Sequence, residues 1–408
     1  MKKRFLSLGL AMAMAASLTA CGGSGSASTT TAAAGEAKAE GESKAAESSA
    51  AADGAVFKIG GIGPVTGGAA VYGLAVQHGA EIAVEEINAA GGINGYQVEF
   101  KFQDDEADAE KSVNAYNALK DWGAQIIDGS TTSGACIAVT DKTKEDNMFQ
   151  ITPSGSAVEC VQYDNNFRVC FSNPNQGLAS AQYIGENGLA EKIAIIYDSS
   201  DVYSSGIYEK FVKEAENQPF EVVAAEAFTA DNKTDFSVQL QKAKDAGADM
   251  VFLPIYYQES ALILTQAAAM GYAPKWFSCD GMDGILGGVD NFDVSLTEGV
   301  MLLTPFAADA TDDLTQSFVT KYKEKYGETP NQFAADSYDA IYVIKAAIEK
   351  SGVTPDMSVS DICDGMKAAM TEITVDGLTG NGMTWTADGE ANKAPKAVVI
   401  ENGAYKAM

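Results

Sequence analysis

Residues 126–157, IIDGSTTSGACIAVTDKTKEDNMFQITPSGSA, decide the fold. The stretch reads as an apolar strand (126–127), a turn of small hydroxyl residues (129–134), a helix (135–146), a second strand (149–151) and a second hydroxyl turn (152–157). A strand, helix and strand in this order predict a parallel βαβ unit, in which both turns lie at the carboxyl edge of the sheet.

These two turns bring hydroxyl groups and free helix N-terminal amides to one edge of the sheet. Such groups suit a small anion, for example a carboxylate. The alternative is that both turns serve only as N-caps for the segments that follow them.

The composition limits the classes of partner. The chain has 408 residues, which corresponds to two or three domains at about 150 residues each. Its net charge is −28, from 56 acidic and 28 basic residues. Such a field repels nucleic acid and anionic membrane surfaces, so we expect no nucleic-acid partner. Because the charge is spread along the chain, we interpret it as a soluble acidic surface.

The N-terminus predicts export and lipid anchoring. Lys2, Lys3 and Arg4 precede an apolar segment (5–16) that is short for a membrane span but typical of a signal peptide. The residues that follow, Leu-Thr-Ala-Cys-Gly ending at position 22, resemble a bacterial lipobox. We therefore expect a signal peptide at 1–20 and lipidation of Cys21, which anchors the chain to the cell membrane. The alternative is a plain secretory signal with an incidental cysteine.

Residues 21–54 lack aromatic side chains and are rich in Ala, Ser, Thr, Gly, Glu and Lys. A segment of this composition buries too little apolar surface to fold, so we interpret it as a flexible tether. The folded part of the chain is then expected outside the cytoplasm.

A second α/β series follows the first and repeats its pattern. The sequence KDWGA (120–124) precedes one strand, and KDAGA (244–248) precedes another. A Val-Tyr pair follows the first strand of each half, with Tyr72 in one and Tyr203 in the other. We therefore predict an α/β fold of two doubly wound lobes that face each other across a cleft.

The end of the chain is expected to connect the lobes. Three helices after position 304 are predicted to return to the first lobe, and a β-hairpin within 380–406 to the second. Several crossings of this kind form a hinge rather than a loose linker. The predicted boundaries are 55–172 plus 305–377 for lobe 1 and 173–304 plus 378–408 for lobe 2.

Enzymatic and metal chemistry have no support in the sequence. The only histidine, His78, lies on a predicted amphipathic helix, so we expect no Ser-His-acid set, and no Gly-x-Ser-x-Gly motif, Walker motif or dinucleotide fingerprint occurs. The acidic run 104–106 has no further oxygen ligands nearby, and we interpret it as a solvated turn. We therefore expect no catalytic residue, no metal and no cofactor.

Five cysteines remain when Cys21 is lipidated, and none forms a Cys-x-x-Cys motif. An odd number leaves at least one cysteine unpaired or paired between molecules. One disulfide is plausible in an exported protein, and we favour Cys136 with Cys160.

The chain from position 56 onward resembles the Leu/Ile/Val-type family of type I periplasmic binding proteins, the substrate-binding lipoproteins of ABC transporters. The lipobox, the tether and the two tandem lobes agree with this family. Four local motifs carry the resemblance: GPVTG (63–67), VYG (71–73), EINAAGGING (86–95) and ITPS (151–154).

The resemblance implies a site for the two ends of an amino acid. It implies that the two hydroxyl turns hold the carboxylate, with Ser133, Ser154 and Ser156, and that Asp280 holds the ammonium. Family members often have Glu at this last position, and the shorter Asp could shift the ligand or recruit a water. The aromatic residues that close over the ligand would be Tyr72, Tyr203, Tyr256 and Phe333. The sequence leaves open whether Tyr256 or its neighbour Tyr257 faces the cleft.

We therefore expect a monomeric, lipid-anchored, extracytoplasmic protein that captures an amino acid by hinge closure and delivers it to an ABC permease. A branched-chain or other apolar amino acid is the first candidate. The alternatives are a sensor for a signalling partner, an exported enzyme on the same fold, and a ligand of another kind: an aromatic amino acid, a small amide or a carboxylate.

Overall fold

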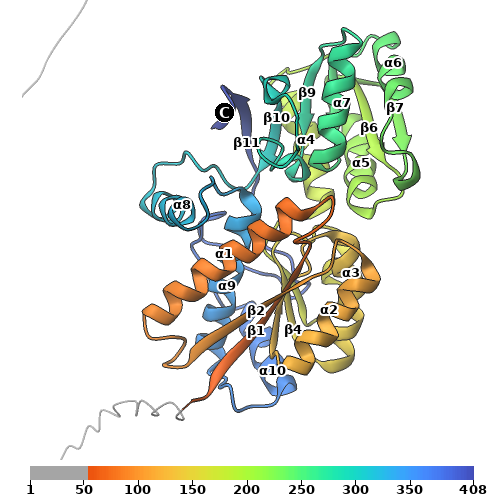
Figure 1. The fold of residues 1–408 in the computed structure, drawn as a ribbon. Coiled ribbons are helices and arrows are strands. Elements are labelled where there is room, and N and C mark those ends of the chain that lie inside the picture. Colours follow the sequence, from red (N-terminus) through yellow and green to blue (C-terminus); the bar gives the residue numbers. More distant parts are fainter. Residues whose placement is uncertain (1–53) are drawn as a thin grey trace, which may run out of the picture. The chain divides into compact units, whose positions relative to one another are not determined.

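The computed structural model describes residues 54–408 (Figure 1). Cys21, the predicted signal peptide and nearly all of the predicted tether lie outside the described residues. No helix within residues 54–408 has the length and apolar character needed to cross a membrane.

The first sheet is entirely parallel, and its strand order is β2-β1-β3-β4-β5. Helices α1 and α9 pack together on one face, and α2 and α3 pack together on the other (Figure 1). The strands and first three helices are β1 (Val56–Gly63), α1 (Ala70–Ala89), β2 (Gln97–Asp104), α2 (Ala109–Trp122), β3 (Ile126–Asp128), α3 (Ser133–Asp146), β4 (Phe149–Thr152) and β5 (Asn166–Arg168).

The second sheet has the order β12-β11-β10-β9-β8-β6-β7. Strands β6 to β10 are parallel, and the hairpin β11–β12 joins β10 in antiparallel orientation. Helices α4 and α5 cover one face, and α6 and α7 the other. The bounds are α4 (Asn173–Glu186), β6 (Lys192–Asp198), α5 (Val202–Ala215), β7 (Glu221–Phe228), α6 (Ser237–Asp245), β8 (Met250–Leu253), α7 (Tyr257–Ala269), β9 (Lys275–Ser278), β10 (Met301–Thr304), β11 (Lys396–Glu401) and β12 (Ala404–Ala407).

The predicted fold class is confirmed, because two mostly parallel sheets, each covered by helices on both faces, form two lobes. The remaining helices are α8 (Asp313–Tyr326), α9 (Gln332–Ser351) and α10 (Val359–Met370), and four short 3₁₀ helices are η1 (Val158–Val161), η2 (Ala230–Asn232), η3 (Asp280–Met282) and η4 (Val294–Thr297). Helix α9 contacts β3 and β4, although it follows β10 of the other sheet in the chain.

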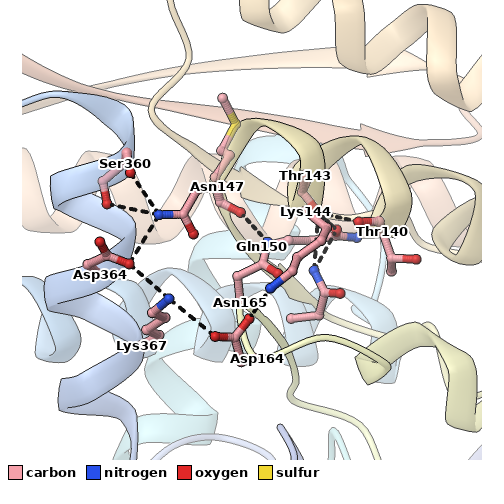
Figure 2. Close-up of polar contacts among 12 residues, drawn as sticks. Thr140, Thr143, Lys144, Asn147, Gln150, Asp164, Asn165, Ser360, Asp364 and Lys367 are labelled. Atoms are coloured by element: carbon pink, nitrogen blue, oxygen red, sulfur yellow. Dashed lines mark hydrogen bonds and ion pairs between the residues drawn. The ribbon is translucent and has the colours of Figure 1, made fainter.

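Polar contacts join α10 to the residues just before β4 and β5, at the amino-terminal ends of these strands (Figure 2). Asn147, which ends α3, donates from Nδ2 to Ser360 Oγ at 2.8 Å and to Asp364 Oδ1 at 3.1 Å. Lys367 pairs with Asp164 at 3.2 Å and with Asp364 at 2.8 Å. These groups are at least partly exposed, so each pair contributes little alone, but together they set where α10 lies.

A single buried ammonium joins the three segments that run between the sheets. Lys393 precedes β11, and its buried Nζ donates to Val169 O at 3.0 Å and pairs with Asp336 Oδ1 at 2.7 Å. Val169 follows β5, and Asp336 lies in the first turns of α9. Burial raises the pKa of Asp336 to about 6 even though Lys393 lowers it.

Two expectations about individual residues are wrong. The acidic run is solvated only in part: Glu106 is exposed, but Asp105 is fully buried, and Asp104 accepts from Val65 N at 2.9 Å and Thr66 Oγ1 at 2.5 Å. The disulfide is absent, since Cys136 and Cys160 are free thiols, although both lie in one buried cluster with Ala157.

Replacing Lys393 by Met should destabilise the protein by about 3–5 kcal/mol at pH 8, because the Asp336 carboxylate loses its buried cation. The loss should be smaller at pH 5, where Asp336 takes up a proton and becomes neutral. Urea denaturation at both pH values measures this difference. The control is Lys345→Met, which removes a partly exposed pair with Glu349 and should cost at most about 0.5 kcal/mol. A Lys393→Met protein as stable as this control would contradict the expectation.

Candidate ligand-binding site

A small cavity, with a volume of about 10 Å³, lies between the carboxyl edges of the two sheets. One wall comes from the two hydroxyl turns that follow β3 and β4. The opposite wall comes from the segment after β9 and from the starts of α5 and α7. The lining residues are Tyr72, Thr131, Thr132, Ser133, Ser154, Tyr203, Tyr256, Asp280, Gly281 and Phe333.

The two hydroxyl turns are hydrogen-bonded to each other. Ser133 Oγ accepts from the backbone N–H of Ser156 at 3.2 Å and of Ala157 at 3.1 Å. Ser154 Oγ donates to Thr131 O at 2.6 Å. Because both lone pairs of Ser133 Oγ are occupied, its hydroxyl is left to donate, which suits an anion. Ser154 has already donated its proton, so its oxygen is left to accept.

Two further hydroxyls in this wall are buried and unpaired. Thr132 Oγ1 and Ser156 Oγ have no hydrogen-bond partner within residues 54–408. Thr132 lines the cavity, whereas Ser156, 1% exposed, does not. An unpaired buried hydroxyl costs free energy, so these two groups have unused capacity to bind a polar ligand.

The opposite wall presents a buried carboxylate. Asp280, 5% exposed, accepts from Tyr203 Oη at 2.6 Å and from Gln176 Nε2 at 2.8 Å. Both donors are neutral, and no Lys or Arg among the described residues lies within 4 Å of this carboxylate. Burial therefore raises the pKa of Asp280 to about 7, against the effect of the two hydrogen bonds.

Aromatic rings fill the space between the two polar walls. Tyr256 stacks on Tyr203 with ring centroids 4.9 Å apart, and Tyr72 packs on Phe333 at 4.4 Å. The hydroxyl of Tyr72 donates to Gly281 O and accepts from Tyr257 N at 3.2 Å, so it joins α1 to the second wall. Of the two adjacent tyrosines, Tyr256 lines the cavity and Tyr257 does not.

All of the site residues named from the sequence except Ser156 line this cavity. The sequence reasoning missed Thr131 and Thr132, although the hydroxyl turn contains them. It also missed Gly281, where a Cβ would come within 2.6 Å of Tyr203 Oη. Gln176 gave no signal, because it lies about a hundred residues from Asp280 in the chain and reaches it only through the fold.

No group of three or more His, Cys, Asp or Glu side chains within the described part of the chain could hold a metal ion. The polar groups of the cavity are therefore one acid, several hydroxyls and backbone amides. This set can bind a small molecule that carries both an anion and a cation.

A model of the periplasmic binding protein family matches residues 56–404. The chain belongs to this family. Members of the periplasmic binding protein family bind solutes for transport and do not form an enzyme class.

The curated relatives include two that are each 30% identical to this chain. One is Leu/Ile/Val-binding protein homolog 3 of Brucella melitensis, aligned over 73% of this chain and 80% of the relative. The other is the leucine-, isoleucine-, valine-, threonine- and alanine-binding protein of Pseudomonas aeruginosa, aligned over 72% and 78%.

Solved structures of the same fold include LivJ of Streptococcus pneumoniae in complex with isoleucine, with a TM-score of 0.78 and 28% identity over 86% of this chain and 98% of that chain. The leucine-binding protein LivK of Thermotoga maritima has a TM-score of 0.77 and 27% identity over the same shares. Isoleucine and leucine are the ligands named for those two proteins.

The raised pKa of Asp280 predicts how stability depends on pH without ligand. Between about pH 4 and pH 7 the folded protein keeps a proton on Asp280 that the unfolded chain has released, so the free energy of unfolding falls as pH rises. Asp280→Asn removes this dependence, and its stability relative to wild type should therefore rise by about 1.4 kcal/mol per pH unit between pH 5 and pH 7.

Urea denaturation of protein refolded without ligand measures these curves. The exposed Asp290→Asn variant is the control and should run parallel to wild type. An Asp280→Asn curve that is also parallel to wild type would show that Asp280 is ionised throughout this range.

Proposed function

We propose that this chain is an extracytoplasmic solute-binding lipoprotein that captures an apolar amino acid and delivers it to an ABC permease. A branched-chain amino acid is the first candidate ligand. The family membership and the ligands named for its relatives support this assignment.

The observation that carries the proposal is the buried Asp280 carboxylate, which has only neutral partners and faces a wall of hydroxyl donors. A ligand ammonium would supply the missing cation. The ligand carboxylate would accept from Ser133 and from the unpaired Thr132, with Ser156 beside them. A zwitterion satisfies both walls, whereas a simple amine or a simple carboxylate satisfies one.

The rest of the cavity suits an apolar side chain. Tyr72, Tyr203, Tyr256 and Phe333 surround the polar groups, and Asp280 is the only charged residue within positions 54–408 that lines the cavity. A charged ligand side chain would therefore be buried without a partner.

Binding proceeds in this proposal by closure of two lobes, 55–172 plus 305–377 and 173–304 plus 378–408. The carboxylate binds first at the two hydroxyl turns of lobe 1, and lobe 2 then brings Asp280 onto the ammonium. The hydrogen bond from Tyr72 to Gly281 joins the two walls only when the lobes meet. The closed form is the one that the permease would recognise.

The protein is proposed to act as a monomer without catalytic residues or cofactor, anchored through a lipid on Cys21. A sensor role would use the same site with a signalling partner in place of the permease, and no feature of the cavity favours it. Ligand recovered unchanged after incubation would exclude an enzymatic role.

A thermal-shift screen of the amino acids tests the proposal directly. Ligand at about 100 times its dissociation constant should add ~2.7 kcal/mol of stability, with leucine, isoleucine or valine among the strongest. Benzoate, phenylalanine and small amides belong in the same screen. A screen with no amino acid among its hits would overturn the assignment.

Asp280→Ala should abolish amino-acid binding, since the ligand ammonium would be buried unpaired at a cost of about 3–5 kcal/mol. Ser133→Ala and Thr132→Val each remove one donor from the cavity wall and should weaken binding by about 1–3 kcal/mol. Isothermal titration with L-leucine measures all three. Asp280→Ala affinity within about threefold of wild type, equal to less than 1 kcal/mol, would show that the ammonium binds elsewhere.

Tyr72→Phe tests the closure step. The variant keeps the ring that packs on Phe333 but loses the hydroxyl that joins the walls, so affinity should fall by about 1 kcal/mol. Because this bond forms only after the lobes meet, stopped-flow measurements should show faster dissociation and a nearly unchanged association rate. A change confined to association would contradict binding by closure.

A further inference from the structure

Arg168 is a fully buried arginine behind the wall of hydroxyl turns. It ends β5 and does not line the cavity. Its Nη1 donates to Ser156 O at 2.6 Å and to Gly155 O at 3.3 Å. Its Nη2 donates to Ala157 O at 2.7 Å, with Val158 O at 3.5 Å. The guanidinium thus faces four consecutive carbonyls of the second hydroxyl turn.

Two of these carbonyls belong to peptide groups that also reach the cavity wall. The peptide group with Gly155 O carries the N–H of Ser156, and the group with Ser156 O carries the N–H of Ala157. Both of these N–H groups donate to Ser133 Oγ. Each peptide dipole therefore has its carbonyl on Arg168 and its N–H on Ser133.

This chain of hydrogen bonds polarises the Ser133 hydroxyl. A cation at the carbonyl end makes each peptide N–H a stronger donor, and two strong donors draw electron density from the serine oxygen. Its remaining proton then becomes a better donor to an anion. The same contacts hold the second hydroxyl turn in place, and this turn donates two N–H groups to Ser133 Oγ in the first hydroxyl turn.

The charge of Arg168 is only partly neutralised. Its Nε lies 3.4 Å from Glu390 Oε2, and the Glu390 side chain is 33% exposed. The C-terminal segment also holds the Arg168 backbone: Trp385 Nε1 donates to Arg168 O at 2.8 Å, and Arg168 N donates to Gly389 O at 3.1 Å. Among the described residues, the partly exposed Glu390 is the one acidic side chain within 4 Å of the Arg168 guanidinium.

We infer that Arg168 is a positioning residue that makes the wall of hydroxyl turns selective for a carboxylate. It acts on Ser133 through the 155–156 and 156–157 peptide groups, and the negative charge of Glu390 weakens this effect. The inference rests on the proposed function, because it concerns the carboxylate of a bound amino acid. A purely structural role for Arg168 predicts instead that all ligands of similar shape lose affinity equally.

The experiment compares L-leucine with L-leucinamide, which keeps the ammonium and side chain but carries a neutral amide in place of the carboxylate. The readout is the dissociation constant of leucinamide divided by that of leucine, measured by competition calorimetry. Arg168→Met should lower this ratio on the order of tenfold, since the anion loses the polarised donor. Arg168→Lys retains the charge, so its ratio of the two dissociation constants should stay close to that of wild type even if both ligands bind more weakly.

Glu390→Gln is the variant that avoids disturbing the buried turn. Removing the counter-charge should raise the ratio about twofold to fivefold by tightening leucine binding alone. Glu401→Gln is the matched control on the same C-terminal segment, since it removes an equal charge from an exposed residue and should leave the ratio unchanged.

The outcomes separate the two proposals. A ratio that falls in Arg168→Met and rises in Glu390→Gln supports the inference. Equal losses for both ligands in Arg168→Met, or an unchanged ratio in Glu390→Gln, overturn it while leaving the proposed function intact. Wild-type protein that binds neither L-leucine nor L-leucinamide overturns the proposed ligand and the inference with it.

Discussion

The carboxyl ends of parallel strands all lie at one edge of the sheet, so the turns that follow them lie there too, and the candidate site depends on this constraint. In the first sheet it brings the turns after β3 and β4 together, so that Ser133 Oγ accepts from Ser156 N and Ser154 Oγ donates to Thr131 O. In the second sheet it brings Asp280, after β9, beside Tyr203 at the start of α5. Two such edges facing each other give one cavity with two chemically opposite walls.

Burial of charge is the second organising feature. Asp280, Asp336 and Arg168 are each removed from water, and each is satisfied differently. Asp336 has its own cation in Lys393, and Arg168 has carbonyls and one solvated carboxylate. Asp280 has only neutral donors, so its charge is left for a ligand. Asp128 and Asp339 are also buried and hydrogen-bonded only to neutral groups, so what distinguishes Asp280 is that it lines the cavity.

The C-terminal part of the chain connects these features. Lys393 ties the segments between the sheets to one another, and Trp385 and Gly389 hold the backbone of Arg168. The segment that precedes β11 therefore contacts both the strand that ends in Arg168 and the start of α9.

The sequence by itself determined the classes of element, the duplication of the α/β unit and the chemistry of the turns. Those properties are local: apolar periodicity, hydroxyl clusters after strands and the Val-Tyr pair at each first helix lie within a few residues of one another. Local pattern could therefore name the two hydroxyl turns and the Val-Tyr pair, whereas a family resemblance supplied the roles of Ser133, Ser154, Tyr72 and Asp280.

Only the tertiary structure decided which groups are partners. Gln176 reaches Asp280, and Lys393 reaches Asp336, through contacts between segments far apart in the chain. The strand that ends in Arg168 has three residues and no periodicity to reveal it, and the burial of Asp105 depends on packing around β1 and β2. Local pattern predicts which groups a turn presents, but long-range packing decides which of them are paired, desolvated and left to bind a ligand.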